Sequence, residues 1–317
     1  MKLPFPGRLL SLAIVSSLAL ALPLAGQAEE KPKVALVMKS LANEFFRTME
    51  DGAKAYQKEH PNDFDLVANG IKDESDTSNQ IRIVEQMIAT GANALVIAPA
   101  DSKALVPVIK KAMDAGITVI NIDNRLDPEV LKSKNLSVPF VGPDNRKGAR
   151  LVGDYLAQQK LKPGDQVGII EGVSTTTNAQ QRTAGFQDAM QAAQIKVVSV
   201  QSGNWEIDKG NAVAAAMLNE YPEIKALLAG NDSMALGAVS AVRAAGKKDQ
   251  VQVVGYDNIN AIKPMLKDGR VLATLDQDAK KQAVYGIQAA LQMIKGEKTA
   301  VDAGNVIQTP VELITKP

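Results

Sequence analysis

The sequence predicts an α/β protein built from two doubly wound, parallel, Rossmann-like sheets. From residue 33 onward, short apolar segments alternate with segments of helical periodicity. The apolar segments are continuous, as expected for parallel strands that helices cover on both faces. The rhythm breaks once, within 117–142, where one strand-like segment follows another without a full helix between them. A single barrel of eight units also fits a chain of 317 residues, but the break favours a crossing to a second sheet near Pro143.

The individual elements follow from this alternation. The expected strands lie at 33–39, 63–68, 93–99, 117–122, 137–142, 166–172, 196–202, 224–230, 251–257 and 271–277. The expected helices lie at 42–56, 79–91, 104–116, 149–159, 178–193, 210–221 and 234–246. Gly91, Gly116 and Gly246 stand at helix ends, where a residue of left-handed conformation often terminates a helix.

Residues 1–28 predict a secretory signal peptide. Lys2 and Arg8 flank the start of an apolar run, and the small residues GQA stand shortly before Glu29. A membrane anchor is the alternative, but the run is shorter than the roughly 20 residues that span a bilayer, and Pro23 interrupts its end. Without cysteine, the chain has neither a site for a lipid anchor nor disulfides. We therefore expect a protein that is free in the bacterial periplasm.

Composition argues against several classes of function. A formal net charge of +1 and the lack of a basic run argue against nucleic acid and anionic membranes as partners. The single histidine, His60, lies at an expected helix end away from the other polar candidates, which leaves a catalytic triad or a zinc site unsupported. Neither common glycine-rich phosphate loop occurs. We expect no cofactor, no metal and no enzyme activity, although Asp123 and Asp257 could approach each other as the carboxylates of a glycoside hydrolase.

Polar side chains stand directly after many of the expected strands. In an open parallel sheet, ligands bind outside the carboxyl ends of the strands. The residues at these ends are Asp123, Asn124, Arg125, Asn231, Asp232, Asp257, Asp276 and Gln277, and Arg182 lies on the helix after another strand. Carboxylate, amide and guanidinium groups can make paired hydrogen bonds to vicinal hydroxyls. Phe45, Phe46 and Trp205 could cover the flat faces of a ring, so the combination predicts a sugar site.

Each of these residues also has a simpler explanation. Asn43 and Asp232 could be the N-caps of the helices that follow them. Phe46 shares a helical face with apolar neighbours and could belong to the core, whereas Phe45 fits that face less well. Trp205 lies among polar residues, which favours a cleft over the core. The prediction of a site therefore depends on the coincidence of such residues at strand ends.

Several motifs, taken together, are typical of one family. In chain order they are NEFFRTMEDGAKAY, NALVIAPADSKAL, ITVINIDNR, QRTAGFQDAM, AGNDSMALGA, VQVVGYDN and VLATLDQ. From about residue 31 onward, the chain resembles the periplasmic sugar-binding proteins of ABC importers, and the ribose-binding branch most closely. Repressors of the lactose type share this fold, but the leader and the lack of a helix-turn-helix distinguish this chain from them.

The resemblance implies the type I periplasmic binding protein fold, in which two lobes joined by a three-segment hinge close on a sugar. The implied lobes are 29–143 plus 277–307 and 144–276 plus 308–317, after a signal peptide at 1–28. The chain would cross between the lobes near Pro143, Asp276 and Gln308.

The resemblance also implies which residues bind the sugar. The positions that match the family's ligand residues are Asn43, Phe45, Phe46, Asp123, Arg182, Trp205, Asn231, Asp257 and Gln277. Lys39 and Asn124 join the candidate site as departures from the ribose pattern. Lys39 stands where ribose binders have a small polar residue, and Asn124 stands where they have the arginine that supplies a bidentate fork. The ligand could therefore be ribose, another pentose or hexose, a polyol such as inositol, or an acidic sugar that meets Lys39.

The implied function is capture of a monosaccharide or polyol and its delivery to an ABC permease in the inner membrane. An alternative is sensing, in which the closed protein docks on a chemoreceptor or sensor kinase. Another is an exported carbohydrate-active enzyme. We expect a monomer that has no nucleic-acid partner.

Overall fold

The computed structural model of the chain describes residues 1–3, 30–299, 301–302 and 304–316. One compact unit comprises Lys31–Pro317, and it contains two six-stranded sheets. Apart from residues 1–3, the predicted signal peptide lies outside the described residues. Among the described helices, none has both the length and the apolar character that a membrane crossing needs.

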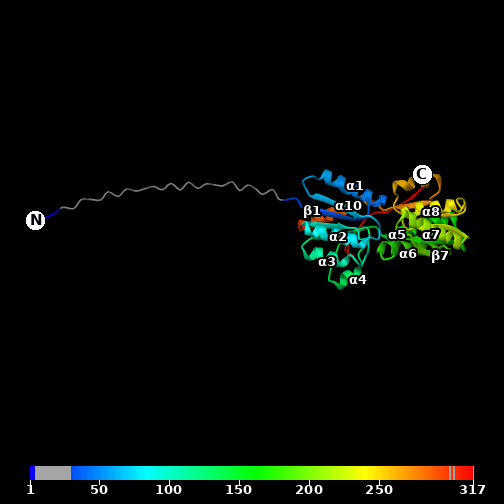
Figure 1. Ribbon diagram of the computed structural model, residues 1–317, viewed down its shortest axis with the longest axis horizontal. Helices are drawn as coiled ribbons and strands as arrows, with labels where there is room; N and C mark the ends of the chain where they lie inside the picture. The colour runs from blue at the N-terminus through cyan, green and yellow to red at the C-terminus, as the bar shows by residue number, and fades with distance from the viewer. Residues whose placement is uncertain (4–29, 300, 303, 317) are drawn as a thin grey trace. The chain divides into compact units, whose positions relative to one another are not determined.

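The first sheet is parallel throughout, with the strand order β11-β5-β4-β3-β1-β2. Its strands are β1 (Lys33–Ser40), β2 (Asp65–Ile71), β3 (Ala94–Ile97), β4 (Thr118–Ile122), β5 (Phe140–Gly142) and β11 (Val306–Gln308). Its helices are α1 (Glu44–Glu59), α2 (Thr77–Ala89), α3 (Val106–Asp114), α4 (Pro128–Ser133) and α10 (Ala279–Ile294). Leu36 of β1 belongs to the apolar cluster with α1 and α10, and Val37 belongs to the cluster with α2 and α3. Helices thus cover both faces, as Figure 1 shows, which explains the continuous apolar sequence of β1.

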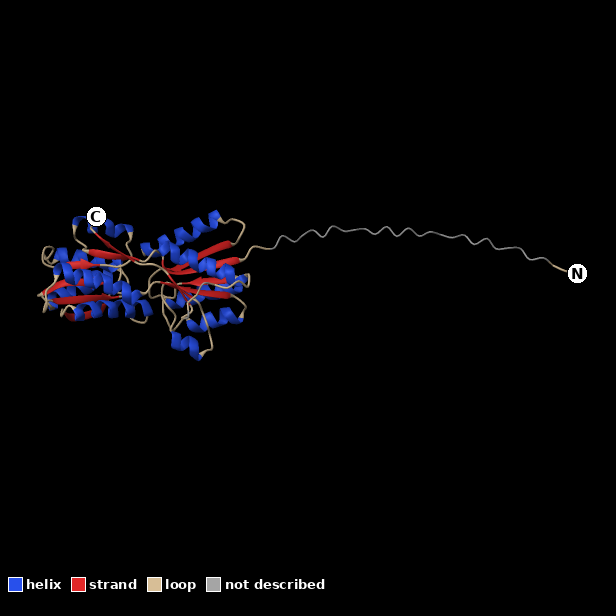
Figure 2. Cartoon of the chain, turned by 180° about the vertical axis from the view of Figure 1, so that it is seen from behind, coloured by secondary structure: helices blue, strands red, loops and turns tan. Residues whose placement is uncertain are grey.

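The second sheet has the strand order β12-β10-β9-β8-β6-β7, in which only β12 is antiparallel to its neighbour. Its strands are β6 (Gln166–Glu171), β7 (Lys196–Ser202), β8 (Ile224–Ala229), β9 (Gln252–Val254), β10 (Ala273–Asp276) and β12 (Glu312–Thr315). Its helices are α5 (Asn145–Lys160), α6 (Thr177–Ala192), α7 (Ile207–Glu220), α8 (Asp232–Ala244), the 3-10 helix η1 (Asn260–Ile262) and α9 (Lys263–Asp268). Phe186 of α6 packs with α5 on one face, and Met217 of α7 packs with α8 on the other. Figure 2 shows the strands of each sheet lying between helices.

Each sheet with its helices forms one lobe, called here the first lobe and the second lobe. The chain passes between them three times, from β5 to α5, from β10 to α10 and from β11 to β12. The predicted fold class, two doubly wound lobes joined by three segments, is confirmed. Helix α10 and strands β11 and β12 are not among the elements predicted from the sequence. After leaving the second lobe, α10 packs on β3, β4 and α1 of the first.

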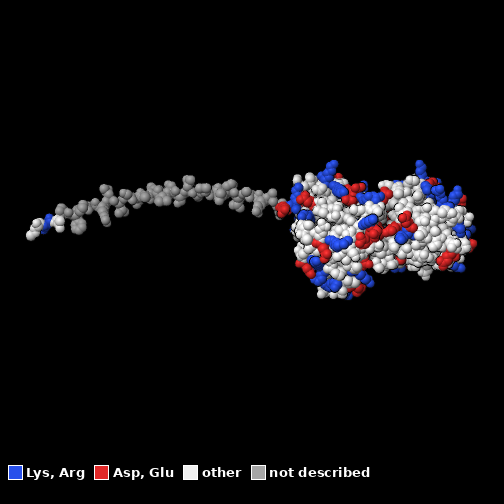
Figure 3. Space-filling view, viewed as in Figure 1, with Lys and Arg blue, Asp and Glu red and all other residues white. Residues whose placement is uncertain are grey.

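Charged side chains of both signs are interspersed on the surface that Figure 3 shows. On the protein surface, opposite charges also pair directly, as in Lys110–Asp114 and Arg146–Asp188. On the face drawn, Lys and Arg do not form the continuous basic stripe that is typical of a nucleic-acid-binding surface.

Candidate ligand-binding site

A cavity lies between the two lobes, where the carboxyl ends of several strands meet. Its lining residues are Lys39, Asn43, Phe45, Phe46, Glu74, Asp123, Asn178, Arg182, Trp205, Asn231, Asp257 and Gln277. The structure therefore brings together Lys39 and every residue that the resemblance implies, and it adds Glu74 and Asn178. The predicted residues that do not line this cavity are Asn124, Arg125, Asp232 and Asp276. Both lobes contribute, because residues of β1, α1 and the loops after β2 and β4 face residues of α6 and the loops after β7, β8 and β9.

The start of α1 forms one wall of the cavity. Asn43 is the N-cap of this helix, as expected, since its Oδ1 accepts a hydrogen bond from the Phe45 N–H at 3.0 Å. Phe45 and Phe46 are both buried, and their rings meet edge to face with centroids 5.1 Å apart. Both also belong to the apolar cluster around Met49. The two interpretations of Phe46 are therefore compatible, because it belongs to the core and to the cavity wall together.

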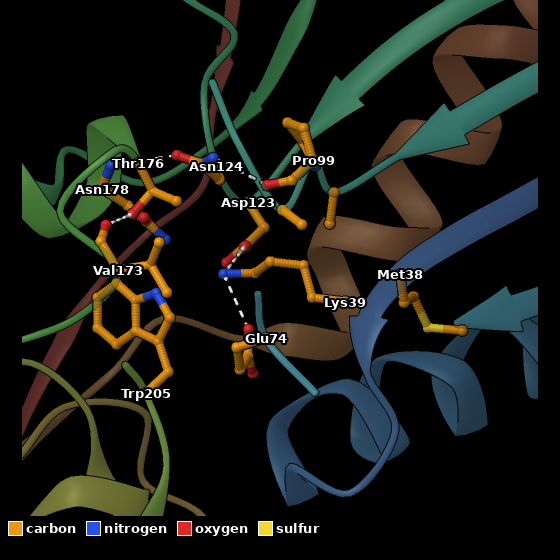
Figure 4. Close-up of polar contacts among 12 residues, drawn as sticks. Met38, Lys39, Glu74, Pro99, Asp123, Asn124, Val173, Thr176, Asn178 and Trp205 are labelled. Carbon is orange, nitrogen blue, oxygen red and sulfur yellow. Dashed lines mark hydrogen bonds and ion pairs between the residues drawn. The ribbon is translucent and has the colours of Figure 1, made fainter. Parts of the chain in front are cut away.

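Lys39, in β1, places its ammonium group between two carboxylates (Figure 4). Its Nζ lies 3.3 Å from Glu74 Oε2 and 3.6 Å from Asp123 Oδ2, and all three side chains are buried. The same Nζ lies 5.3 Å from the ring centroids of Phe46 and Trp205, within the range of cation–π attraction. Burial raises the pKa of Glu74, and the charge of Lys39 works against that rise. Within the described residues, Glu74 Oε2 and Asp123 Oδ2 make no hydrogen bond.

Arg182 projects from α6 and is held in one orientation by its neighbours. Its Nε donates to Asn145 Oδ1 at 2.8 Å, and its Nη1 donates to the Gly230 carbonyl at 3.0 Å. The guanidinium carbon lies 3.8 Å from the ring centroid of Tyr256, and Nη1 lies 3.6 Å from Asp257 Oδ1. A planar group that is stacked on one side and hydrogen-bonded at its edge presents its fork in a defined direction.

Asp257 and Gln277 follow β9 and β10 and form a short polar chain. Gln277 Nε2 donates to Asp257 Oδ1 at 2.6 Å, and Gln282 Nε2 donates to Gln277 Oε1 at 3.2 Å. Burial raises the pKa of Asp257 well above its ordinary value, and the charge of Arg182 works against that rise. The side chains that would face a ligand are thus positioned by a second layer of hydrogen bonds.

Asn231 caps α8 and ties it to the loop that carries Trp205. Its Oδ1 accepts from the Met234 N–H at 2.9 Å, and its Nδ2 donates to the Trp205 carbonyl at 3.2 Å. The expectation that Asp232 caps this helix is wrong. Asp232 is already helical, and its carboxylate faces away from the cap to other partners.

The carboxylate of Asp232 is buried behind the cavity. It accepts hydrogen bonds from Thr274 Oγ1 at 2.7 Å and from the Ile259 N–H at 3.1 Å. Burial raises its pKa from 3.8 to about 7, although these hydrogen bonds oppose the rise. At a pH between 3.8 and about 7, the carboxyl of Asp232 is protonated in the folded chain and ionised in the unfolded chain. The contribution of Asp232 to stability therefore falls as the pH rises above about 4, and the loss is complete above about 7.

Three cavity residues have positive φ angles, namely Asp123 (+60°), Trp205 (+67°) and Asp257 (+124°). A left-handed backbone costs a residue with a side chain about 1–2 kcal/mol, and such strain persists where the surroundings impose it. Trp205 is only 3% exposed, and its ring lies against Gly172, where an added Cβ would be 2.0 Å from the ring. Trp205 is thus a cleft residue, as expected, but a deeply buried one.

Asn124 is a predicted site residue that the structure does not bring to the cavity lining. Its Nδ2 donates to the Pro99 carbonyl at 2.8 Å, and its Oδ1 accepts from the Asn178 N–H at 3.2 Å and from Ser102 Oγ at 3.3 Å (Figure 4). The left-handed backbone at Asp123 turns the chain at this point, so the two neighbouring side chains meet different surroundings. Asn124 therefore links the two lobes beside the cavity, and its contact with a bound sugar stays a prediction.

Two groups of hydrogen bonds connect the lobes beside the cavity. Ser102 Oγ accepts from the Thr177 N–H at 2.9 Å and from Thr177 Oγ1 at 3.0 Å. Glu44 accepts from the N–H groups of Asn260 at 2.8 Å and Ala261 at 3.2 Å. In both cases a side chain of the first lobe binds the beginning of a helix of the second lobe, where backbone N–H groups lack partners within the helix.

Glu74 and Asn178 are cavity residues that the sequence prediction missed. Glu74 comes shortly after β2, so the criterion of polar residues at strand ends would have identified it if applied to that strand. Asn178 lies in the first turn of α6, four residues before Arg182, and only its position in that polar segment hinted at a role.

Comparison with known proteins identifies the class. A family model described as a periplasmic binding protein domain matches residues 34–298. Over 313 residues, the chain is 72% identical to a D-ribose/D-allose-binding protein of Pseudomonas aeruginosa, and the alignment covers 98% of each chain. The chain therefore belongs to the periplasmic binding protein family.

Two solved structures place it among the solute-binding proteins of ABC transporters. One, from Burkholderia multivorans, holds an unknown ligand represented as alpha-D-erythrofuranose. It is 75% identical, has a TM-score of 0.86, and the match covers 90% of this chain and 99% of that one. The other, from Actinobacillus succinogenes, has bound D-allose. It is 36% identical, has a TM-score of 0.83, and the match covers 90% of this chain and 98% of that one.

Proposed function

We propose that this protein is the periplasmic binding component of an ABC importer for a neutral monosaccharide of the ribose and allose type. The observation that carries the proposal is the cavity between the lobes, where forked polar groups surround the flat faces of Phe46 and Trp205. Carboxylate, amide and guanidinium groups suit pairs of vicinal hydroxyls. The relative that is named for D-ribose and D-allose and the solved structure with D-allose support the same ligand class.

The two sugars fit one site for a chemical reason. D-allopyranose is the ring of D-ribopyranose with one hydroxymethyl group added, so both present the same pattern of ring hydroxyls. In the proposed complex, Asp123 and Asp257 accept hydrogen bonds from hydroxyls, and Arg182 donates to them. Asn231 and Gln277 contribute amide groups that hydrogen-bond to the sugar. The bound sugar is then released unchanged, without a chemical reaction.

Closure of the two lobes over the sugar belongs to the same proposal. The hydrogen bonds of Ser102 with Thr177 and of Glu44 with Asn260 support it, because they require the lobes to be together. The closed form is then the state that a permease recognises, and the sugar shifts the population toward that state. Export through the segment 1–28 and a monomeric state complete the proposal.

A thermal-shift screen tests the function. The protein, without residues 1–28, is unfolded, freed of carried-over ligand and refolded before it meets D-ribose, D-allose, other aldoses, polyols and amino acids. A ligand at a hundredfold excess over its Kd stabilises the native state by about 2.7 kcal/mol. We expect the largest shifts with D-allose and D-ribose. The absence of a shift with every carbohydrate would contradict the proposal.

A further inference from the structure

The arrangement of charges around Lys39 bears on which sugars the cavity accepts. A lone buried ammonium group would attract an acidic sugar, and the sequence leaves that ligand class open. In the structure, however, Lys39 Nζ is flanked by Glu74 at 3.3 Å and Asp123 at 3.6 Å. The single ammonium group of Lys39 therefore already has two protein carboxylates beside it.

Across the cavity lining, carboxylates outnumber cations. The cations of the lining are Lys39 and Arg182, and the carboxylates are Glu74, Asp123 and Asp257. Arg182 lies 3.6 Å from Asp257, as close as Lys39 lies to Asp123. Lys39 and Arg182 thus each have a carboxylate partner in Asp123 and Asp257. Glu74 is the carboxylate beyond this one-to-one pairing, and it also flanks Lys39.

We propose that Glu74 is a specificity-determining residue that restricts the cavity to neutral sugars. This inference rests on the proposed function and names the residue that sets the ligand class within it. A sugar carboxylate that entered the cavity would lose its water and find both cations already paired, which makes its burial unfavourable. A hydroxyl, in contrast, can donate a hydrogen bond to a carboxylate oxygen. Glu74 Oε2 and Asp123 Oδ2 are buried oxygens of this kind that face Lys39, as Figure 4 shows.

The position of Glu74 is held independently of Lys39. Its Oε1 accepts a hydrogen bond from Asn43 Nδ2 at 3.0 Å. Asn43 in turn caps the start of α1 through its hydrogen bond with the Phe45 N–H. A glutamine at position 74 would keep an oxygen acceptor for Asn43 while losing the negative charge. The substitution Glu74→Gln therefore separates the charge of this residue from its shape.

The experiment compares three ligands that share one ring, namely D-allose, D-alluronate and D-alluronamide. Titration calorimetry gives the Kd of each for the wild type, for Glu74→Gln and for Glu85→Gln. Glu85 is an exposed residue of α2 that pairs with Lys111 on the surface, so it serves as a matched control. We expect the wild type and the control to prefer D-allose over D-alluronate by about a hundredfold or more, and Glu74→Gln to reduce that preference by at least about tenfold. An unchanged preference in Glu74→Gln overturns the inference.

The amide provides a test that needs no variant. D-alluronamide matches D-alluronate in size but carries no charge, so the wild type should bind the amide at least about tenfold more tightly than the acid. Equal exclusion of both would make the discrimination steric and overturn the inference even if Glu74→Gln failed to fold. If the wild type did not bind D-allose at all, the proposed function would fail, and the inference with it. Normal binding of D-allose with no preference against the acid overturns the inference alone.

Discussion

Replacing Ser102 with alanine should weaken the binding of every sugar by the same factor. Ser102 lies in the first lobe, outside the cavity lining, and its hydroxyl binds the N–H and the hydroxyl of Thr177 at the start of α6. The substitution removes contacts that form only when the lobes are together. It therefore changes the equilibrium between open and closed forms, which is common to all ligands.

The magnitude follows from the hydrogen bonds lost. Ser102 Oγ is engaged with Thr177 N, Thr177 Oγ1 and Asn124 Oδ1 at 2.9, 3.0 and 3.3 Å. A hydrogen bond contributes about 0.5–1.5 kcal/mol net, because water satisfies the same groups when they are exposed. The contact to Asn124 is longer and contributes little. We therefore expect the free energy of sugar binding to weaken by about 1–2 kcal/mol, which corresponds to a Kd about 5- to 30-fold higher.

Titration calorimetry with D-ribose and D-allose measures both consequences. The two Kd values should rise together, so that their ratio stays at the wild-type value. Ser133→Ala is the matched control, since Ser133 is an exposed serine of α4 whose hydroxyl donates to the Val130 carbonyl of the same helix. An unchanged Kd in Ser102→Ala, or a ratio that differs from the wild type, would refute the reasoning that links this contact to closure.

Three further predictions concern the cavity and the residue behind it. Gly172→Ala should weaken sugar binding and shift the emission of Trp205, the only tryptophan, because the new Cβ would lie 2.0 Å from its ring; unaltered emission and affinity would show that the ring is not confined there. Arg182→Ala should weaken the free energy of sugar binding by about 2–5 kcal/mol, because the buried carboxylate of Asp257 loses its cation. Calorimetry measures this loss, and a near-normal affinity would remove Arg182 from the site. Asp232→Asn should flatten the pH dependence of the melting temperature. The wild type loses stability between about pH 4 and 7, whereas the asparagine of the variant has no proton to release. Parallel curves of melting temperature against pH for the two proteins would contradict a buried, protonated carboxyl at position 232.

Much of the fold was predictable because many of the buried strands carry two signals in the sequence. Strands such as 117–122 are mostly apolar runs, and a polar residue that cannot remain buried without partners follows many of them. Helix α10 is absent from the predicted elements although its sequence is apolar and periodic, because the predicted alternation ends with the strand at 271–277. Strands β11 and β12 are too short for periodicity to identify them, and they exist through pairing with β5 and β10.

The site was predictable where one rule governs a residue and unpredictable where two distant segments meet. Asp123 and Asp257 were found because each follows a parallel strand, Asp123 after β4 and Asp257 after β9. The position of Asn124 outside the lining was not predictable, because no local pattern reveals that the backbone of Asp123 is left-handed. The partnership of Lys39 with Glu74 joins positions 35 residues apart, and nothing in either local sequence specifies it.

The central claim, that the cavity between the lobes binds a neutral monosaccharide through its hydroxyl pattern, is tested most directly by calorimetry with two epimers. D-allose and D-glucose differ only in the orientation of one ring hydroxyl, at C3. A site built from buried, paired polar groups should reject the wrong epimer, so we predict saturable one-to-one binding of D-allose and an affinity for D-glucose lower by about a hundredfold or more. Equal affinities for the two epimers, or no heat of binding with either, would contradict the account.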